Sequence, residues 1–593
     1  MDPAEDELVA LVVGPDPFAP SVLAVVGSAR IVPEGAWSGS TEVGMPLLAD
    51  LERRHHPRWV VWSAAAALRP LVMAREGPSR CWDLAECHRL LEGGWRADPG
   101  VVWALATGLD PRQAPRPSLL GPGGPDLFSV TDEGSADPLD AAGFLRSEAL
   151  DPAWVSTPER ALILAKLARR AADGQHRLLP RLGARGRYTV AAESAAAVLC
   201  LELERDGLPV DRAELERLIA TAAGPRPTDA DDERRLKAAR DAVVLAAAPP
   251  RAAPTDLRNP AQVKALLGAA GVTVETTRKW ELEPYRASHP LVDALLRWRA
   301  DERIATTFGY RWVDEHVGTD DRLRGTWSAC DGAAGRMTAQ NGLHSLPALL
   351  RPGVAAHDGH VLVRADLGQI EPRVLAVVSG DRALAAATAA DDLYQPVAQR
   401  LGVERAVAKV AMLAAMYGQR SGAAGEALAG MERAFPVATT FLDRAYATGV
   451  GRGVLRTYGG RLIRLDDPEV GAPGAAAEQT EPGPGSSALS AAARRSKDAA
   501  RGRYARNAVV QGSAAELFKA WAATVRHAVA PSEAQVVLCL HDELLIHAPE
   551  PRAEEVAAAV VSSLDSSARR WAGTDAVRFV AEIAIVHRWS EAK

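Results

Sequence analysis

The chain has 593 residues, of which 47% are hydrophobic and 24% are charged, and its formal net charge is −6. This composition is typical of soluble globular protein, and the length predicts about three or four domains. We find no apolar run long enough to cross a bilayer and no charged-then-apolar signal at the start of the chain, so a soluble, cytoplasmic protein is expected.

The cysteines and the net charge constrain the chemistry further. The five cysteines, Cys81, Cys87, Cys200, Cys330 and Cys539, do not have the spacing of metal ligands. An odd, scattered set predicts reduced thiols rather than a disulfide framework. A net charge of −6 does not indicate a nucleic-acid-binding protein. It does not exclude one either, because phosphate contacts require only one basic groove.

The first third of the chain alternates between ordered and irregular segments. Residues 1–105 combine short apolar runs with helical stretches, which predicts a small α/β unit. Residues 106–150 are rich in Pro, Gly and Asp and predict a linker or long loop. Pro158 to Leu179 has a helical Ala/Leu/Arg pattern.

The middle of the chain is predicted to be helical. Ala191 to Ala220 predicts a helical pair broken at Asp206-Gly207, and Asn259 to Val317 is again helical. Between them, residues 223–256 form a Pro/Ala/Asp-rich interruption around a short charged helix. Strands and helices mix from Leu323 onward.

One helical segment has an unusual stripe of side chains. Arg405, Lys409, Leu413 and Tyr417 recur every fourth residue before Gly418. On a helix this spacing places them on one face, with the first and last roughly 18 Å apart. Two cations followed by apolar and aromatic surface suit a nucleoside triphosphate. The alternative is a half-buried surface helix whose cations extend to solvent.

Acidic residues follow or join predicted strands at two distant places. A buried strand from His360 to Ala365 ends at Asp366, and apolar runs on both sides of residues 541–543 predict a β-hairpin with Asp542 and Glu543 at its tip. If the strands pair, Asp366 and Asp542 meet at one sheet edge. Close carboxylates repel unless cations lie between them, and hard oxygen ligands suit Mg²⁺. The alternative is that both motifs are turn residues.

Taken together, these segments resemble the family-A DNA polymerases, the polymerase-I type. Asp366–Arg373 resembles the family's first catalytic motif, Arg405–Gly418 its nucleotide-binding fingers helix, and residues 541–543 its second catalytic motif. Further matches follow in the family's order: Gly335-Arg336, Leu343–Pro347, Thr457–Arg461, Arg503 with Asn507–Gly512, and Trp589–Lys593. The resemblance covers about residues 190 to 593.

The resemblance implies an α+β multidomain fold, a right-hand polymerase with palm, fingers and thumb, preceded by a degenerate ribonuclease-H-like 3′–5′ exonuclease domain. The implied domains are an inactive exonuclease-like domain at 1–187, a thumb at 188–320, a palm at 321–380 and 511–593, and fingers at 381–510 with a low-complexity insertion at 468–487.

The resemblance also implies a DNA-directed DNA polymerase, a nucleotidyltransferase working by two-metal-ion phosphoryl transfer. Asp366 and Asp542 would hold two Mg²⁺ ions, with the Leu367 carbonyl as a further ligand and Glu543 as an auxiliary acid. Lys409 would protonate the leaving pyrophosphate.

The remaining implied roles concern substrates. Nucleotide-binding residues would be Arg405, Lys409, Leu413, Tyr417, Glu371, Gln369 and His541. DNA-binding residues would be Arg336, Arg503, Asn507 and Gln511, which would check base-pair geometry through minor-groove acceptors. Glu371 would favour deoxyribose by excluding a 2′-hydroxyl.

The sequence departs from the family pattern at the nucleotide site. Leu413 occupies a position that is usually aromatic, and Met412 and Ala414 replace the usual Asn and Gly. Pro372 replaces a usual Leu, and His344-Ser345 replaces a usual Gln-Asn pair. We expect an active polymerase with altered nucleotide handling.

The N-terminal region resembles a short actinobacterial-type branch of bifunctional exonuclease/polymerases, but it lacks the acids that proofreading needs. The first apolar run, Leu8–Val13, carries no carboxylate, and the second, Val22–Val26, carries none either. Asp83 is the one well-placed candidate, and a single Asp is more often a helix cap. We therefore expect a nuclease-like fold without nuclease activity.

The expected partners are primer-template DNA and dNTPs, with no membrane, for a monomer associated with the nucleoid. Three alternatives stay open: a DNA-binding protein with little synthesis, a polymerase that uses RNA templates or ribonucleotides, and a polymerase that retains 3′–5′ exonuclease activity.

Overall fold

The computed structural model describes residues 7–117, 137–250, 254–332, 334–418, 423–465, 491–540 and 542–592. The insertion predicted at 468–487 lies outside these ranges. The chain forms two compact units. The first unit comprises Met1–Arg205, Thr326–Thr338 and Val363–Ala584, and the second comprises Asp206–Gly325, Ala339–Leu362 and Ile585–Lys593.

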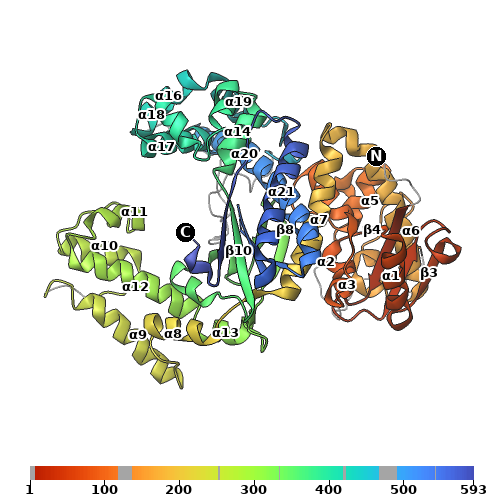
Figure 1. Ribbon diagram of the computed structural model, residues 1–593, viewed down its shortest axis with the longest axis horizontal. Coiled ribbons are helices and arrows are strands. Elements are labelled where there is room, and N and C mark those ends of the chain that lie inside the picture. Colours follow the sequence, from red (N-terminus) through yellow and green to blue (C-terminus); the bar gives the residue numbers. More distant parts are fainter. Residues whose placement is uncertain are drawn as a thin grey trace. The chain divides into compact units, whose positions relative to one another are not determined.

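The first unit begins with a five-stranded sheet of order β3-β2-β1-β4-β5, of which Figure 1 labels β3 and β4. Its strands are β1 (Leu8–Gly14), β2 (Val22–Val26), β3 (Ala36–Ser40), β4 (Arg58–Val61) and β5 (Arg80–Asp83). β1 pairs antiparallel with β2 and parallel with β4. The apolar runs of the sequence become buried strands, and the predicted α/β unit is confirmed.

Helices accompany this sheet. They are α1 (Thr41–His55), α2 (Ala64–Ala67), α3 (Arg69–Met73), α4 (Leu84–Glu92), α5 (Pro99–Thr107) and α6 (Pro158–Leu178). α6 follows the predicted helix closely: Thr157 caps its first turn and Pro158 occupies its first position, where a missing N–H has no consequence.

A second sheet of order β13-β14-β10-β15 carries both acidic motifs. Its strands are β10 (His360–Leu367), β13 (Gln535–Leu540), β14 (Glu543–Pro549) and β15 (Ala581–Val586). The predicted hairpin is confirmed as β13 and β14, with β14 next to β10. Two details differ from the prediction. β10 continues through Asp366 to Leu367, and Glu543 begins β14 instead of standing in the turn.

The rest of the first unit is mainly helical. Its helices are α7 (Gly186–Asp206), α14 (Ile370–Ser379), α15 (Arg382–Ala387), α16 (Tyr394–Leu401), α17 (Arg405–Tyr417), α18 (Ala423–Ala434), α19 (Pro436–Val450), α20 (Ala491–Val529) and α21 (Ala553–Ala572). Two short hairpins, β8 (Trp327–Asp331) with β9 (Arg336–Ala339) and β11 (Leu455–Arg456) with β12 (Leu462–Ile463), complete it.

A buried ionic cluster joins distant segments of the first unit. Glu193 on α7 accepts a hydrogen bond from Lys519 on α20 and forms an ion pair of 2.8 Å with Arg461. The side chains of Glu193 and Lys519 are 1% and 0% exposed. Because an isolated buried charge is very unfavourable, each of these charged side chains needs its partners of opposite charge to remain buried.

The second unit is helical around two short strands. Its elements are β6 (Leu208–Pro209), α8 (Arg212–Ala223), α9 (Ala230–Leu245), α10 (Pro260–Ala269), α11 (Lys279–Leu282), α12 (Pro290–Thr307), α13 (Tyr310–His316) and β7 (Arg322–Leu323). The predicted break at Asp206-Gly207 and the charged helix within 223–256, now α9, are confirmed.

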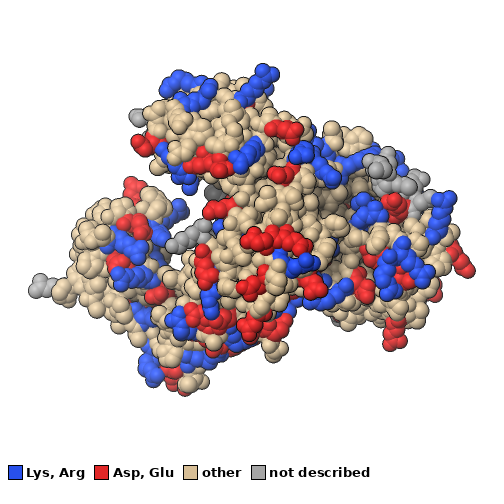
Figure 2. All heavy atoms as spheres, in the orientation of Figure 1, with Lys and Arg blue, Asp and Glu red and all other residues tan. Residues whose placement is uncertain are grey.

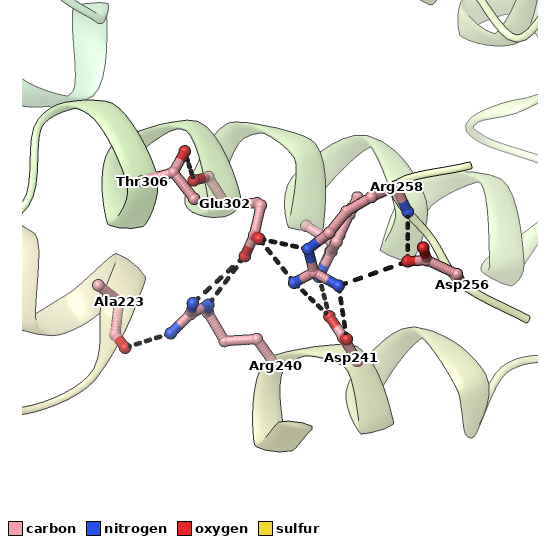
Figure 3. A network of polar contacts seen from close by, with 8 residues as sticks. Ala223, Arg240, Asp241, Asp256, Arg258, Glu302 and Thr306 are labelled. Atoms are coloured by element: carbon pink, nitrogen blue, oxygen red, sulfur yellow. Dashed lines mark hydrogen bonds and ion pairs between the residues drawn. The ribbon is translucent and has the colours of Figure 1, made fainter. Parts of the chain in front are cut away.

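An ionic network holds α9 against α12 (Figure 3). The carboxylate of Glu302 on α12 accepts hydrogen bonds from Arg240 on α9 at 3.2 Å and from Arg258 at 2.8 Å. Arg258 also donates to Asp241 at 2.8 Å. α9 has few buried apolar residues, so these contacts fix its position more than a hydrophobic face does.

Charged side chains of both signs are interspersed on the face shown in Figure 2. This mixture agrees with the small net charge of −6. Among the described residues, no helix is both long and apolar enough to span a membrane.

Candidate active site

The two predicted aspartates lie next to each other. The backbone N–H of Leu367 donates a hydrogen bond of 2.8 Å to the backbone carbonyl of Asp542, which places the turn of the β13–β14 hairpin against the end of β10. Burial, followed by the negative charge of Asp366, raises the pKa of Asp542 to about 6. Burial also raises the pKa of Asp366, against the attraction of Arg364. The predicted convergence of these carboxylates is confirmed.

An arginine that the sequence analysis did not identify lies within this acidic cluster. Arg364 lies two residues before Asp366, on the same face of β10, and donates a hydrogen bond of 2.6 Å to its Oδ2. It also donates from Nε to Oε1 of Glu543 across 2.7 Å. Glu543 is therefore buried and ion-paired, in place of the exposed acid expected at a hairpin tip.

A cavity of about 390 Å³ opens beside Asp542. Six predicted site residues line it: Arg336, Gln369, Glu371, Leu413, Gln511 and Asp542. Ile370, Pro372, Tyr394, Met416, Ala514 and Ala515 supply the rest of the wall. Of these, Tyr394 is the largest that the sequence analysis missed. It begins α16, far from the recognised motifs, and burial followed by the charge of Glu371 raises its pKa to about 12.

Polar contacts fix Glu371 and Gln369 in the cavity wall. Arg336 donates to Glu371 across 3.2 Å, and the hydroxyl of Tyr417 lies 3.5 Å from its other oxygen. Burial raises the pKa of Glu371, and Arg336 opposes that shift. The amide oxygen of Gln369 accepts a hydrogen bond of 2.9 Å from the backbone N–H of Leu393, so its side chain is already engaged.

The helix α17 forms as predicted, with Gly418 ending it at a φ of +71°. Of its stripe, Arg405, Lys409 and Tyr417 are exposed, and Leu413 is half-buried. Neither cation lines the cavity. Arg405 instead forms an ion pair with Asp392. The structure thus places Leu413 in the cavity wall and leaves both cations and Tyr417 at the surface.

The other predicted contacts lie on α20 and the hairpin turn. Arg503 is exposed, and its aliphatic part lies next to Gly418, where an added Cβ would meet it at 3.4 Å. The side-chain oxygen of Asn507 is buried without a hydrogen-bond partner in the described part of the chain. His541 lies outside the described residues.

The donor set suits a divalent ion that needs few protein ligands. No group of three or more His, Cys, Asp or Glu side chains in the described ranges is arranged to hold a metal. Asp366 and Asp542 instead offer two carboxylates that interact with each other. Mg²⁺ binds through one or two carboxylates and completes its shell with water and substrate phosphates, so these residues fit it.

This site lies within a region that matches a known family. Residues 255–591 match the model described as DNA polymerase family A, which is more than half of the chain. The chain belongs to DNA polymerase family A.

Relatives of this family-A chain include bacterial DNA polymerases I. It is 28% identical over 349 residues to the thermostable DNA polymerase I of Thermus filiformis, covering 54% of this chain and 38% of the relative. It is 29% identical over 300 residues to DNA polymerase I of Deinococcus radiodurans, covering 47% of this chain and 30% of the relative. The matches thus span less than half of these relatives' length.

The fold of the family-A chain is similar to a solved structure, the POL domain of Pol1 from M. smegmatis in complex with DNA primer-template and dNTP. The TM-score is 0.67 at 21% sequence identity, over 98% of this chain and 95% of that one. The fold is therefore that of a family-A polymerase.

Asp83, the sequence candidate for a nuclease metal ligand, is a structural residue. Its Oδ1 accepts a hydrogen bond of 3.0 Å from the N–H of Glu86, capping α4, and its Oδ2 accepts one of 2.7 Å from the N–H of Ala64. The residue is 2% exposed. Both carboxylate oxygens are occupied by backbone donors, as the helix-cap interpretation predicts.

Proposed function

We propose that this chain is a DNA-directed DNA polymerase that adds deoxynucleotides to a primer 3′ end on a DNA template. The observation that carries the proposal is the juxtaposition of Asp366 and Asp542 beside a cavity walled by Glu371 and Leu413. Family membership supports the reaction class, and the M. smegmatis neighbour was solved with primer-template and dNTP.

Asp366, Asp542 and the Leu367 carbonyl would hold two Mg²⁺ ions. When bound, these ions lower the pKa of the attacking primer hydroxyl and neutralise the leaving pyrophosphate. The protein's own groups position the substrates, which supplies most of the catalysis in phosphoryl transfer. Lys409 and Arg405, exposed on α17, would neutralise the triphosphate, and Lys409 would donate a proton to pyrophosphate.

The cavity would receive the sugar and base of the incoming nucleotide. Leu413 and Met416 supply apolar surface, and Glu371 presents its carboxylate next to them. A 2′-hydroxyl would meet that carboxylate, which favours deoxyribose. Tyr417, whose hydroxyl lies 3.5 Å from Glu371, would stack at the templating position. DNA would be contacted by Arg336, Arg503, Asn507 and Gln511, and the primer end by His541.

The domain assignment is part of the proposal. The thumb would be 188–320, the palm 321–380 and 511–593, and the fingers 381–510. Residues 1–187 would be a nuclease-like domain without proofreading, because β1 carries no carboxylate and Asp83 is occupied as a helix cap. Metal-dependent release of mismatched 3′ nucleotides that Asp83→Asn abolishes would contradict the loss of proofreading.

Extension of a labelled primer tests the proposal. The chain should add the templated nucleotide with Mg²⁺ and dNTPs on a DNA template, and much less with rNTPs or an RNA template. Retained primer-template binding without extension would favour a DNA-binding protein. Equal use of rNTPs would favour the ribonucleotide alternative.

A further inference from the structure

Arg364 is the cation at the centre of an acidic cluster. Its guanidinium bridges Asp366 and Glu543, at 2.6 Å and 2.7 Å, and it also interacts with Glu582 on β15. The side chains of Arg364 and Glu543 are 13% and 10% exposed. The carboxylate of Asp542 in turn interacts with those of Asp366 and Glu543. One arginine thus interacts with three acids that would otherwise repel one another.

The geometry of this bridge is set by strand alternation. Arg364 and Asp366 are two residues apart on β10, so both project from one face of the sheet. Glu543 begins the neighbouring strand β14 and presents its carboxylate to the same guanidinium. The planar fork of an arginine can bond two carboxylates at once, whereas a lysine ammonium is a single point charge.

We propose that Arg364 is a positioning residue that holds the acidic cluster together as a built-in counter-ion and, by occupying Oδ2 of Asp366, competes with divalent metal for that carboxylate. The inference rests on the proposed function, since it takes Asp366 and Asp542 as the metal-binding pair. Its consequence is that the site stays assembled without metal and binds metal weakly until the phosphates of a substrate add negative charge.

Metal binding by the substrate-free protein tests the inference without relying on activity. Binding of Mn²⁺ is followed by the loss of the free Mn²⁺ signal in electron paramagnetic resonance. Removing a positive charge this close to a divalent ion should tighten binding, so Arg364→Gln should lower the Kd for Mn²⁺ by about tenfold. Unchanged or weaker binding by a folded Arg364→Gln protein would overturn the inference.

A matched control is available in the same unit. Arg69 pairs with Glu204 at 2.7 Å, with side chains 15% and 12% exposed, so it resembles Arg364 in burial. Arg69→Gln should leave the Kd for Mn²⁺ unchanged. An equal tightening in Arg69→Gln would mean that loosening the fold is the cause, and would overturn the specific role of Arg364.

Two further variants separate the possible failures. Asp542→Asn should weaken Mn²⁺ binding; if it does not, the proposed metal site fails and this inference fails with it. If Asp542→Asn weakens binding and Arg364→Gln does not tighten it, only the role of Arg364 fails. If Arg364→Gln does not fold, Arg364→Lys is the test. A lysine ammonium reaches only one of the two carboxylates, so the Kd for Mn²⁺ should fall about threefold. An unchanged Kd for Mn²⁺ would contradict the inference.

Discussion

The backbone N–H of Leu367 donates a hydrogen bond of 2.8 Å to the backbone carbonyl of Asp542. This bond joins the end of β10 to the turn of the β13–β14 hairpin through the main chain, and the charge of the Asp366 carboxylate acts on that of Asp542. Such convergence is unfavourable in the absence of cations. The pKa of Asp542 rises from 3.8 to about 6, mainly by burial and then by the charge of Asp366.

Asp542→Asn should therefore stabilise the metal-free protein at pH 8. The folded state disfavours the ionised carboxylate, so wild type loses stability as the pH rises from about 4 to about 6, and the loss is constant above that range. We expect the variant to melt about 1–3 °C higher at pH 8 in EDTA, with no difference below about pH 4. Differential scanning fluorimetry measures this. Asp575→Asn, at a side chain 86% exposed, should not change the Tm. A lower Tm for Asp542→Asn at pH 8 would contradict the prediction.

Glu371→Ala should relax discrimination against ribonucleotides. Arg336 holds the Glu371 carboxylate in the cavity wall at 3.2 Å, so under the proposed function a 2′-hydroxyl would meet a fixed, desolvated group. Removing it should raise kcat/KM for rNTPs relative to dNTPs by about tenfold or more in single-nucleotide incorporation. Glu371→Gln keeps the shape and should have a much smaller effect. Equal discrimination in Glu371→Ala and wild type would exclude this role.

Leu413→Phe should lower the KM for dNTPs. Leu413 lines a cavity of about 390 Å³ together with Met416 and Pro372, and an aromatic ring there would cover more of the base and sugar. A gain of about 1 kcal/mol from aromatic packing corresponds to roughly fivefold in KM. Leu413→Met, which conserves volume, serves as the control and should behave as wild type. If Leu413→Phe and wild type have the same KM for dNTPs in single-nucleotide incorporation, the proposed role of this position is wrong.

Several of these features could be predicted from the sequence because their determinants are local. The four-residue spacing and Gly418 predict the extent of α17, and the apolar runs predict the β13–β14 hairpin. The place of Asp83 just before a helical segment predicts its role as the N-cap of α4. Arg364 was missed although the signal was present: it lies two residues before Asp366 on one strand face. Its second partner, Glu543, is brought near by the pairing of β14 with β10, and the local sequence pattern does not predict that pairing.

Other features depend on tertiary structure alone. Tyr394 reaches the cavity from the start of α16, and no periodicity links it to Leu413 or Glu371. Likewise, Arg405 was predicted as a phosphate ligand from its place on α17, whereas its partner Asp392 comes from the segment before α16. Contacts between elements distant in sequence require the fold to be known.

Glu193→Gln should strongly destabilise the first unit. Glu193 forms ion pairs with Lys519 and Arg461 in the buried interior, and the variant would leave both cations without this carboxylate. We expect a loss of about 3–5 kcal/mol in the free energy of unfolding, measured by urea denaturation. Glu216→Gln, which breaks an ion pair with side chains 44% and 37% exposed, should cost less than about 1 kcal/mol. Similar effects of the two variants would contradict the buried-cluster account.

The most direct test compares primer extension by wild type, Asp366→Asn and Asp542→Asn with Mg²⁺, dNTPs and a labelled primer-template. Both variants should lose about a thousandfold or more in rate while still folding and binding DNA, and Asp575→Asn should match wild type. Extension at near wild-type rate by either aspartate variant would contradict the claim that this pair of carboxylates carries the chemistry.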